Sequence, residues 1–311
     1  MAFYRALGTG MVISADSPID DKVRSAMESL IEDYEHVLSR FRNDSLIAAI
    51  GKAEHGGSFD FPDWCAPLFD LYDALFSATS GAIDPCVGED LIRLGYDASL
   101  SFTVTQDAPE HLGALRGRAV WGRDVTRHGT TLVTHEPVQL DFGACGKGYL
   151  VDLLGRMLQS SQFVIDAGGD LLIHAEQPIS VALEDPEDQS HAIGIAHIAN
   201  GALCASAPSR RHWNVAVNER TQIAIHHLLN AIDGLPAQQT EASWAYVPAN
   251  ATLNLARDYP TAVADGLATA LFVSDVAQLQ RTFDFTYATL DESRQIAVSR
   301  NFPADLFLRS A

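Results

Sequence analysis

The sequence predicts an α+β protein on the strength of three observations. Stretches with strand-like alternation cluster along the chain, and helical stretches are interspersed without the strict βαβ order of a doubly wound sheet. One helical stretch is long and strongly amphipathic. The 311 residues show no repeat or low-complexity segment, and 47% of them are hydrophobic and 20% charged. This balance is ordinary for a globular chain with room for one large domain or two closely packed ones.

Local patterns define the N-terminal elements. Residues 5–15, RALGTGMVISA, alternate and are rich in small and β-branched residues, which predicts a strand. Over residues 20–41, apolar side chains recur at three- and four-residue steps, which predicts an amphipathic helix. NDSLIAAI, residues 43–50, indicates a cap and a short second helix. Residues 62–79 predict another helix, with Pro62 near its start and a stop signal at 80–81.

The remaining elements are shorter. Within residues 117–142, the patches AVWGRDV, TTLVTH and PVQLDF predict a meander. A helix is expected from about residue 146 to 160, then a strand QFVIDAGG that DLLIHA continues. Short strands and turns are expected over residues 178–258, followed by a short helix in TAVADGLATALFVS and a mixed tail.

Charge and cysteine usage limit the partners and the compartment. The formal net charge of −19 disfavours nucleic acid and anionic membranes as partners. No run of about 18 apolar residues is present, so no membrane span is predicted. The start of the sequence does not resemble a signal peptide, and the four cysteines form no CxxC motif. We therefore expect a cytoplasmic location, with a removed leader as the open alternative.

The stretch LDFGACGKGYLVD, residues 140–152, combines three glycines and a lysine at the start of a predicted helix. Lys147 is followed by Gly148 rather than Ser or Thr, and the spacing is too short, which argues against a P-loop. Glycines still allow a ligand to approach the backbone, and a helix N-terminus with a lysine suits an anion. A tight turn with an exposed lysine explains the stretch equally well.

Four other stretches carry candidate residues, each with a plain structural alternative. Two of them are either ligand-contacting loops or simple turns, namely DAGGDL and SGAIDPCVG. In HHLLNAIDGLPA, alternation points two histidines to opposite faces, so one of them is a candidate general base. In ADGLATALF, Asp265 and Thr269 lie on one helical face and offer hard oxygens suited to Mg²⁺, although a capped core helix gives the same pattern.

Taken in order, eight segments resemble the ApbE family of FAD:protein FMN transferases. They are LGT, LSRFRNDS, TSGAIDP, LDFGACGKGYLVD, DAGGD, ASAPSRRHW, HHLLNAIDGLPA and ADGLATALF. Each is weak alone, but together they span residues 7 to about 273 in the family's order and at about its spacing. The resemblance implies a single T-fold-like ApbE domain over residues 1–311. It would have antiparallel sheets, packed helices and a ligand cleft between two intimately packed lobes.

The resemblance also implies an activity and its cofactors. In the family, FAD lies in a cleft and Mg²⁺ bridges its pyrophosphate. A Thr or Ser hydroxyl of a target flavoprotein attacks the FMN phosphorus, and AMP leaves. The implied partners are therefore FAD, Mg²⁺ and an acceptor protein with a Thr/Ser target motif. His227 would take the proton of the attacking hydroxyl, and Lys147 would neutralise charge on the pyrophosphate.

The resemblance assigns further roles residue by residue. The residues at FAD-contacting positions are Leu7, Phe41, Ala82, Ile83, Asp84, Asp141, Lys147, Gly168, Gly169, Asp170, Ser206 and Leu228. The residues at metal positions are Asp265 and Thr269, with Ala144 and Ala268 through their carbonyls. Leu7 stands where the family usually has methionine.

Several positions depart from the family pattern, chiefly on the acceptor side. Asn230, Ala231 and Asp233 replace an aspartate, a proline and a threonine in the segment after the histidine. Ala207 and Gly266 replace a glycine and an alanine elsewhere. Two alternatives therefore remain beside the transferase. One is an FAD pyrophosphatase that gives FMN and AMP, and the other is a non-catalytic FAD-binding protein.

Overall fold

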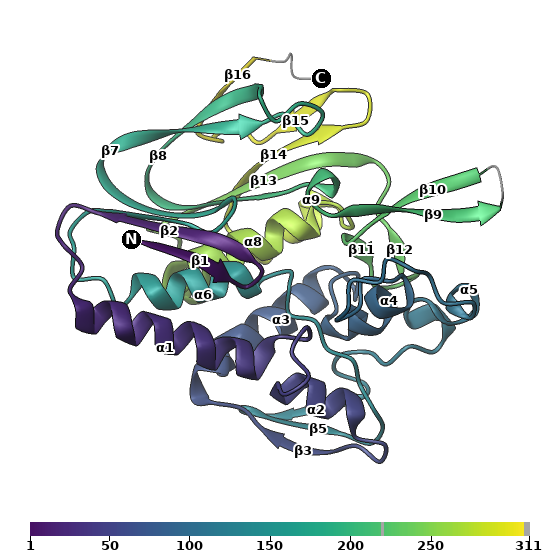
Figure 1. Cartoon of the computed structure of the whole chain (residues 1–311). Helices are drawn as coiled ribbons and strands as arrows, with labels where there is room; N and C mark the ends of the chain where they lie inside the picture. The colour runs from purple at the N-terminus through teal and green to yellow at the C-terminus, as the bar shows by residue number, and fades with distance from the viewer. Residues whose placement is uncertain (219–220, 308–311) are drawn as a thin grey trace. The chain divides into compact units, whose positions relative to one another are not determined.

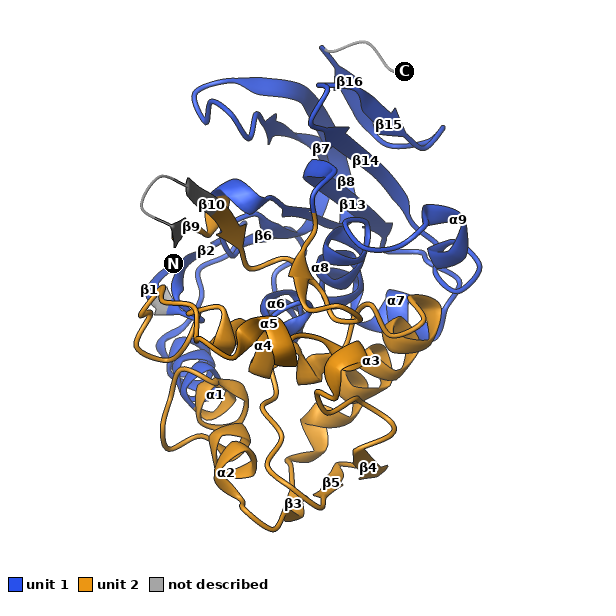
Figure 2. Cartoon of the chain, turned by 90° about the vertical axis from the view of Figure 1, so that its right-hand side faces the viewer, with its two compact units in different colours: residues 1–32, 143–209, 238–311 blue, residues 33–142, 210–237 orange. Residues whose placement is uncertain are grey.

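The computed structural model describes residues 1–218 and 221–307, and the chain forms two compact units. Unit 1 comprises residues 1–32, 143–209 and 238–311, and unit 2 comprises residues 33–142 and 210–237, drawn in blue and orange in Figure 2. The expectation of one domain over residues 1–311, with a ligand cleft between packed lobes, stays a prediction.

The main sheet of unit 1 is antiparallel in every described pairing. Its order is β1-β2-β6-β7-β8-β13-β14-β15, and β16 pairs with β8 (Figure 1). The strands are β1 Ala2–Ala6, β2 Thr9–Ala15, β6 Phe163–Asp166, β7 Asp170–Glu184, β8 Ala192–Ser206, β13 Thr240–Pro248, β14 Thr286–Asp291, β15 Ile296–Val298 and β16 Ala304–Leu306. Together with the helices, this sheet confirms the predicted α+β class.

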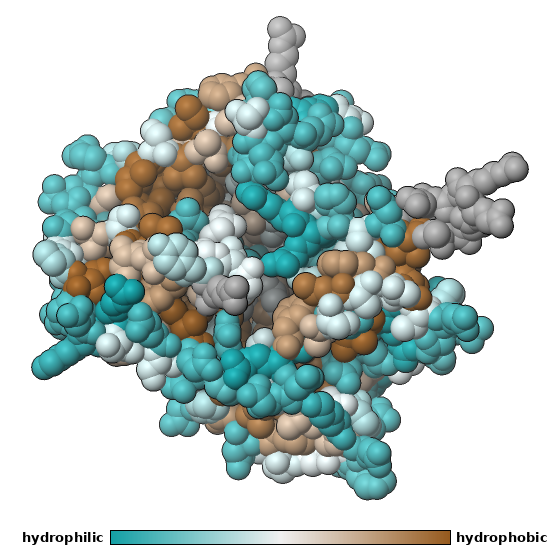
Figure 3. Space-filling view, in the orientation of Figure 1, coloured by the Kyte–Doolittle hydropathy of each residue, from teal (hydrophilic) through white to brown (hydrophobic). Residues whose placement is uncertain are grey.

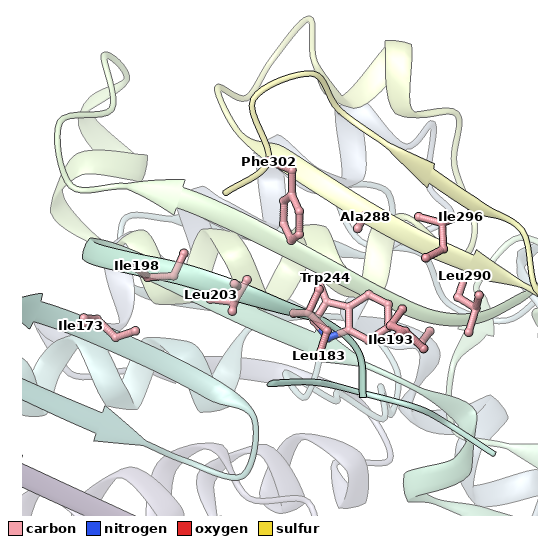
Figure 4. Close-up of a cluster of buried hydrophobic side chains, with 12 residues drawn as sticks. Ile173, Leu183, Ile193, Ile198, Leu203, Trp244, Ala288, Leu290, Ile296 and Phe302 are labelled. Carbon is pink, nitrogen blue, oxygen red and sulfur yellow. The ribbon is translucent and has the colours of Figure 1, made fainter. Parts of the chain in front are cut away.

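Alternation along the central strands separates two buried layers. Leu172, Cys204 and Ser243 contact the helices α6 (Gly146–Gly155) and α8 (Pro260–Ala270), which lie side by side against β7, β8 and β13. Their neighbours in sequence point to the other side of the sheet. There they join a cluster of buried side chains (Figure 4). The cluster includes Ile173, Leu183, Ile193, Ile198, Leu203, Trp244, Leu290, Ile296 and Phe302.

Unit 1 also contains two shorter helices, and unit 2 contains several. α7 (Asn254–Asp258) and α9 (Val276–Leu279) belong to unit 1, and α1 (Asp21–Leu38) begins in unit 1 and ends in unit 2. The helices of unit 2 are α2 Leu46–Lys52, α3 Ala66–Ala78, α4 Gly88–Arg93 and α5 Ala108–His111. Short 3₁₀ turns cover Asp63–Cys65, Pro85–Val87 and Ala114–Arg116 in this unit.

The strands of unit 2 form a small sheet and two hairpins. The sheet has the order β3-β5-β4, with β3 Gly57–Asp60, β4 Val125–His128 and β5 Thr131–Thr134. The hairpins pair β9 (His212–Asn218) with β10 (Thr221–His226) and β11 (Leu229–Asn230) with β12 (Leu235–Pro236). A buried cluster beside them includes Leu91, Leu94, Tyr96, Leu112, Trp213, Ile225 and Leu229.

The predicted helices near residues 20–41, 43–50, 62–79 and 261–274 are confirmed as α1, α2, α3 and α8. Ser45 caps α2, because its Oγ accepts a hydrogen bond from the Ala48 N–H at 3.1 Å. The helix predicted from about 146 to 160 is α6, but it ends at Gly155. The long N-terminal helix ends at Leu38 rather than Phe41.

Several strand predictions were wrong, mainly because turns were taken for strand interior. Residues 5–15 are not one strand but a hairpin of β1 and β2, whose turn places Leu7 and Gly8 at φ 53° and 72°. DLLIHA does not continue QFVIDAGG: the chain reverses at Gly168 and Gly169, with φ 71° and 106°, so β6 and β7 pair antiparallel.

The predicted meander and the region of short strands also need correction. AVWGRDV is mostly turn, PVQLDF forms no strand, and the third partner of the small sheet is β3, which the sequence pattern missed. Residues 178–258 contain the last seven residues of β7, all of β8 and β13, the short strands β9 to β12, and the helix α7. The β7–β8 pair breaks register between His174 and Ile179, which interrupted the alternation needed to recognise a long strand.

The surface mixes polar and apolar side chains. Figure 3 shows hydrophobic residues interspersed among hydrophilic ones on the face that it displays. Large exposed apolar side chains include Tyr4, Phe41, Leu115 and Phe307. Among the described residues, every helix is too short or too polar to cross a bilayer.

The junction of α6 and α8 is built from two reciprocal caps. Asp152, near the end of α6, accepts hydrogen bonds from the Thr261 and Ala262 N–H groups in the first turn of α8, at 3.1 and 2.8 Å. Asp265 of α8 in turn accepts from the Gly148 N–H in the first turn of α6, at 3.0 Å. Each helix therefore supplies the anion that satisfies the other's N-terminal donors.

Gly148 makes this junction possible by lacking a side chain. A Cβ at Gly148 would lie 2.3 Å from the Thr261 carbonyl oxygen. The sequence predicts that Gly148 lets a ligand approach the backbone, but in the structure the main chain of α8 approaches it instead. Burial raises the pKa of Asp152 to about 7, and hydrogen bonds from Ala262 and Thr261 hold it from rising further.

We expect Gly148→Ala to destabilise the protein by about 1–3 kcal/mol, because α8 would have to move away. Alanine is intrinsically preferred over glycine in a helix by about 1 kcal/mol, so a gain in stability would contradict the proposed contact. Gly10→Ala is the matched control, because a Cβ there would have its nearest neighbour at 4.0 Å. Urea denaturation of both variants measures the difference.

Candidate functional site

The central feature of unit 1 is a lysine held between two buried carboxylates. Lys147 is the second residue of α6, Asp170 is the first of β7, and Asp265 lies within α8. The Lys147 Nζ lies 2.9 Å from Asp170 Oδ2 and 3.1 Å from Asp265 Oδ1. The two carboxylate side chains are 1% and 2% exposed, whereas the lysine side chain is 35% exposed. The reciprocal caps fix this arrangement.

The three charges leave one negative charge uncompensated. Burial, followed by the nearby negative charge of Asp170, raises the pKa of Asp265 to about 7, although Lys147 opposes the rise. Burial disfavours the charged form of Lys147, but the two carboxylates outweigh it and raise the lysine pKa above its ordinary value. A second cation near these carboxylates would therefore be stabilised.

Further oxygen donors of the kind that Mg²⁺ prefers lie on α8, at the end of β8 and in the turn before α6. Ser206 Oγ, at the end of β8, lies 3.5 Å from Thr269 Oγ1 on α8. The Ser243 hydroxyl donates to the Ala268 carbonyl at 2.6 Å, so one lone pair of that carbonyl is already used. Ala144 lies in the turn that leads into α6.

These donors are of the chemical types found around a magnesium ion that also binds phosphate. Among the described residues, no group of three His, Cys, Asp or Glu side chains is suitably placed to hold a metal. Mg²⁺ is commonly held by one or two carboxylates, with waters and substrate phosphates completing its shell. A single carboxylate with neutral hydroxyl and carbonyl oxygens matches that mode. The metal role of Ala144, Asp265, Ala268 and Thr269 stays a prediction.

The LGT and DAGGD segments meet in unit 1. A Cβ at Gly168 would lie 2.7 Å from Thr9 Oγ1, so glycine is required there by both the contact and the positive φ. The N–H groups of Gly168 and Gly169 donate to Asp166 Oδ1 at 2.9 and 3.2 Å. Leu7 lies in the adjoining β1–β2 turn. The structure thus brings together two segments that the resemblance assigns to one ligand.

The remaining predicted residues belong to unit 2. They are Phe41, Ala82, Ile83, Asp84, Asp141, His227 and Leu228. Ala82, Ile83 and Asp84 follow α3 and are all buried. The Asp84 carboxylate accepts hydrogen bonds from the N–H groups of Cys86 and Trp121, at 2.8 and 3.3 Å. It therefore holds the loop in place, and burial raises its pKa.

Sequence reasoning missed Arg40, although it stands beside Phe41 in the LSRFRNDS segment. The Arg40 guanidinium forms an ion pair with Asp141 and lies 4.2 and 4.7 Å from the ring centroids of Phe41 and Tyr96. Tyr96 stacks on Trp213 at 5.8 Å. Phe41, 41% exposed, presents an aromatic face beside a cation. The signal that the sequence offered was a cationic residue directly before Phe41, the aromatic residue predicted to contact FAD.

The two histidines of HHLLNAIDGLPA have different roles. His226 is buried, donates from Nε2 to the Ala237 carbonyl at 2.7 Å and accepts at Nδ1 from the Leu228 N–H. Burial lowers its pKa, so it is a neutral structural residue. His227 is half-buried, and its Nδ1 lies 3.2 Å from the Arg211 carbonyl. Because a carbonyl only accepts, Nδ1 carries the proton and Nε2 is the basic nitrogen.

Removing the lysine should expose the repulsion between the two carboxylates. We expect Lys147→Met to destabilise the protein by about 2 kcal/mol, less than the roughly 3–5 kcal/mol of a fully buried pair, because the side chain is partly exposed. Without the lysine, the pKa of Asp265, which burial already raises, rises further above its unfolded value. The native state then binds more protons than the unfolded state, and stability falls as pH rises.

Urea denaturation at about pH 5 and about pH 8 tests this linkage. The deficit relative to wild type should be larger at the higher pH. Lys22→Met, at an exposed position of α1, is the control and should show no such dependence. A deficit that is equal at both pH values would mean that the lysine stabilises the cluster only by packing.

Comparison with known proteins agrees with the resemblance. The model of the ApbE family matches residues 7–289. A protein of Treponema pallidum named FAD:protein FMN transferase is 27% identical over 286 residues, which cover 81% of this chain and 72% of that protein. Two solved structures have the same fold. The ApbE protein of Thermotoga maritima has a TM-score of 0.77 at 19% identity and covers 97% of this chain and 98% of its own.

The flavin transferase ApbE of Vibrio cholerae has a TM-score of 0.75 at 17% identity, with 97% of both chains covered. At such identities the structural likeness establishes the fold, whereas the family model covers most of the sequence. The chain belongs to the ApbE family.

Proposed function

We propose that this protein transfers FMN from FAD to a Thr or Ser hydroxyl of an acceptor flavoprotein, with Mg²⁺ as cofactor and AMP as the second product. The observation that carries the proposal is the placement of Lys147 between Asp170 and Asp265 at the start of α6. The printed names of the Treponema and Vibrio relatives, a FAD:protein FMN transferase and a flavin transferase, support the same reaction. We also propose a cytoplasmic location.

The diphosphate of FAD is the group that this cluster suits. Asp265, Thr269 and the carbonyls of Ala144 and Ala268 would hold Mg²⁺, which supplies positive charge to a phosphoryl group and its leaving group. Lys147 adds a second positive charge at the N-terminus of a helix, where anions are favoured. The uncompensated negative charge of the cluster is then balanced.

The chemical step needs a base and a positioned hydroxyl rather than a protein nucleophile. The acceptor oxygen forms a bond to the FMN phosphorus as the bond to the AMP oxygen breaks. His227 takes the hydroxyl proton at Nε2, because its Nδ1 donates to the Arg211 carbonyl. Lys147 stabilises the charge that grows on AMP as it leaves.

Water is the competing acceptor, and the departures from the family pattern in the loop after His227 motivate that alternative. In this loop, the residues that depart from the family pattern form hydrogen bonds within the protein. The Ala231 N–H donates to the Ala82 carbonyl at 3.0 Å, a bond that a proline would lack. Asn230 Oδ1 accepts from the Ile232 N–H at 3.0 Å, and Asp233 Oδ1 accepts from the Leu235 N–H at 2.9 Å. These hydrogen bonds hold the loop in a defined conformation.

The deciding experiment is incubation with FAD and Mg²⁺, with and without an acceptor domain carrying the family's target motif. Intact mass spectrometry of the acceptor should show an increase equal to FMN less one water, and AMP should appear only with acceptor present. Asp265→Ala should abolish transfer. Asp258→Ala, an aspartate with a side chain 49% exposed on α7, should leave it unchanged.

Other outcomes identify the competing functions. FMN and AMP formed without acceptor would show a pyrophosphatase. Tight FAD binding with no turnover under any divalent ion, and equal binding by Asp265→Ala, would show a non-catalytic flavin-binding protein.

A further inference from the structure

Unit 2 contains a fully buried arginine that the proposed reaction does not use. Arg118 is 3% exposed, although arginine is rarely buried without partners. Its Nε lies 2.8 Å from Asp90 Oδ2, and its Nη2 lies 3.5 Å from Asp84 Oδ2. The side chains of Asp90 and Asp84 are 0% and 1% exposed. A charge trio this deeply buried is weak evidence for added stability, because well-packed apolar residues often stabilise equally well.

The same guanidinium reaches the loop that follows His227. Arg118 Nη2 donates to the Ala231 carbonyl at 2.7 Å, and Nη1 donates to the Ala119 carbonyl. The Ala231 carbonyl also accepts from the Ala114 N–H at 3.1 Å, while the Ala231 N–H donates to Ala82 at 3.0 Å. Ala231 is thus bound on both sides, four residues after the proposed base.

The partners of Arg118 are themselves anchors of other segments. Asp84 Oδ1 accepts from the Cys86 N–H, and Asp90 Oδ1 accepts from the Gly113 N–H, both at 2.8 Å. Gly113 packs tightly against the turn between β11 and β12, since a Cβ there would lie 2.3 Å from the Asp233 carbonyl carbon. One guanidinium therefore ties residues 82–84, helix α4, the turn at 113–118 and the loop at 227–234 together.

We propose that Arg118 is a positioning residue that fixes the segment 82–84 and the loop carrying His227 in a single arrangement. It acts through Asp84, Asp90 and the Ala231 carbonyl, and touches neither substrate nor reacting atoms. The proposal rests on the proposed function for the meaning of His227 and FAD, but the arrangement itself can be tested without catalysis. The planar fork of arginine is required, because a lysine cannot reach two carboxylates and a carbonyl at once.

The chain offers a matched control for this role. Arg127 also binds two carboxylates, Asp70 and Asp73, each at 2.6 Å, and it donates to the Gly129 carbonyl at 2.7 Å. Its partners lie on α3 and beside β4, away from the segment 82–84 and the loop 227–234 in sequence. Arg127→Lys therefore removes a comparable but partly exposed fork. Its link to the proposed arrangement is indirect, through Asp73 and Trp121 to Asp84.

The primary measurement is the titration of His227 by imidazole nitrogen NMR, assigned by comparison with His227→Ala. In Arg118→Lys we expect the His227 pKa to shift by about 0.5 unit or more, because its loop loses an anchor. FAD affinity, measured by flavin fluorescence, should fall about tenfold, since displaced binding groups lose much of their effect. Arg127→Lys should change neither, although both variants should lower the melting temperature.

Asp90→Asn is the second variant, for use if Arg118→Lys does not fold. It keeps the acceptor for Gly113 and should shift the same two readouts in the same direction by a smaller amount. The proposal is overturned if the folded variants lower only the melting temperature and leave the His227 titration and FAD affinity at wild-type values. If the wild type transfers no FMN, the proposed function is refuted but the positioning role of Arg118 is not. The His227 titration still reports the position of the loop, because it does not depend on catalysis.

Discussion

The exchange of caps between α6 and α8 is the constraint on which the rest of unit 1 depends. Asp152 satisfies the N-terminal donors of α8, and Asp265 satisfies a donor of α6. Because the exchange requires close approach, the crossing point is a glycine, Gly148. The geometry that holds the helices together also places Asp265 beside Lys147. Structure and proposed chemistry therefore share one carboxylate.

In unit 2, loops rather than helices have to be held in position. Its predicted ligand-contacting segments are loops, so they cannot rely on helix or sheet ladders for their position. Buried charged side chains hold these loops instead. Arg118 and its two carboxylates bind the main-chain carbonyl and N–H groups of the loops. In both units, buried ionic groups hold the backbone of a neighbouring segment, and in unit 1 the same carboxylate is also a proposed metal ligand.

The sequence was most informative where one pattern persisted over many residues. The three- and four-residue spacing from Val23 to Leu38 defined α1, and Ser45 marked a cap, because both signals are local. Reversals at Leu7–Gly8 and Gly168–Gly169 were missed, since a two-residue turn barely interrupts alternation. Asp152 was missed because the N–H groups that it caps lie more than one hundred residues away, and Arg118 was missed because its carboxylate partners lie on other elements and its Ala231 partner is also more than one hundred residues away. The resemblance supplied the candidate site that propensity could not.

The division of unit 1 into three chain segments has a consequence for folding order. The cluster in Figure 4 needs Ile296 and Phe302, and β16 completes the sheet beside β8, so that core closes only after nearly the whole chain has been synthesised. β2 is synthesised early, with only β1 before it, and its other partner β6 follows more than 140 residues later. Such distant pairings slow folding and leave strand edges exposed in the interim, so this half of the protein is the part that most needs protection from aggregation on the ribosome.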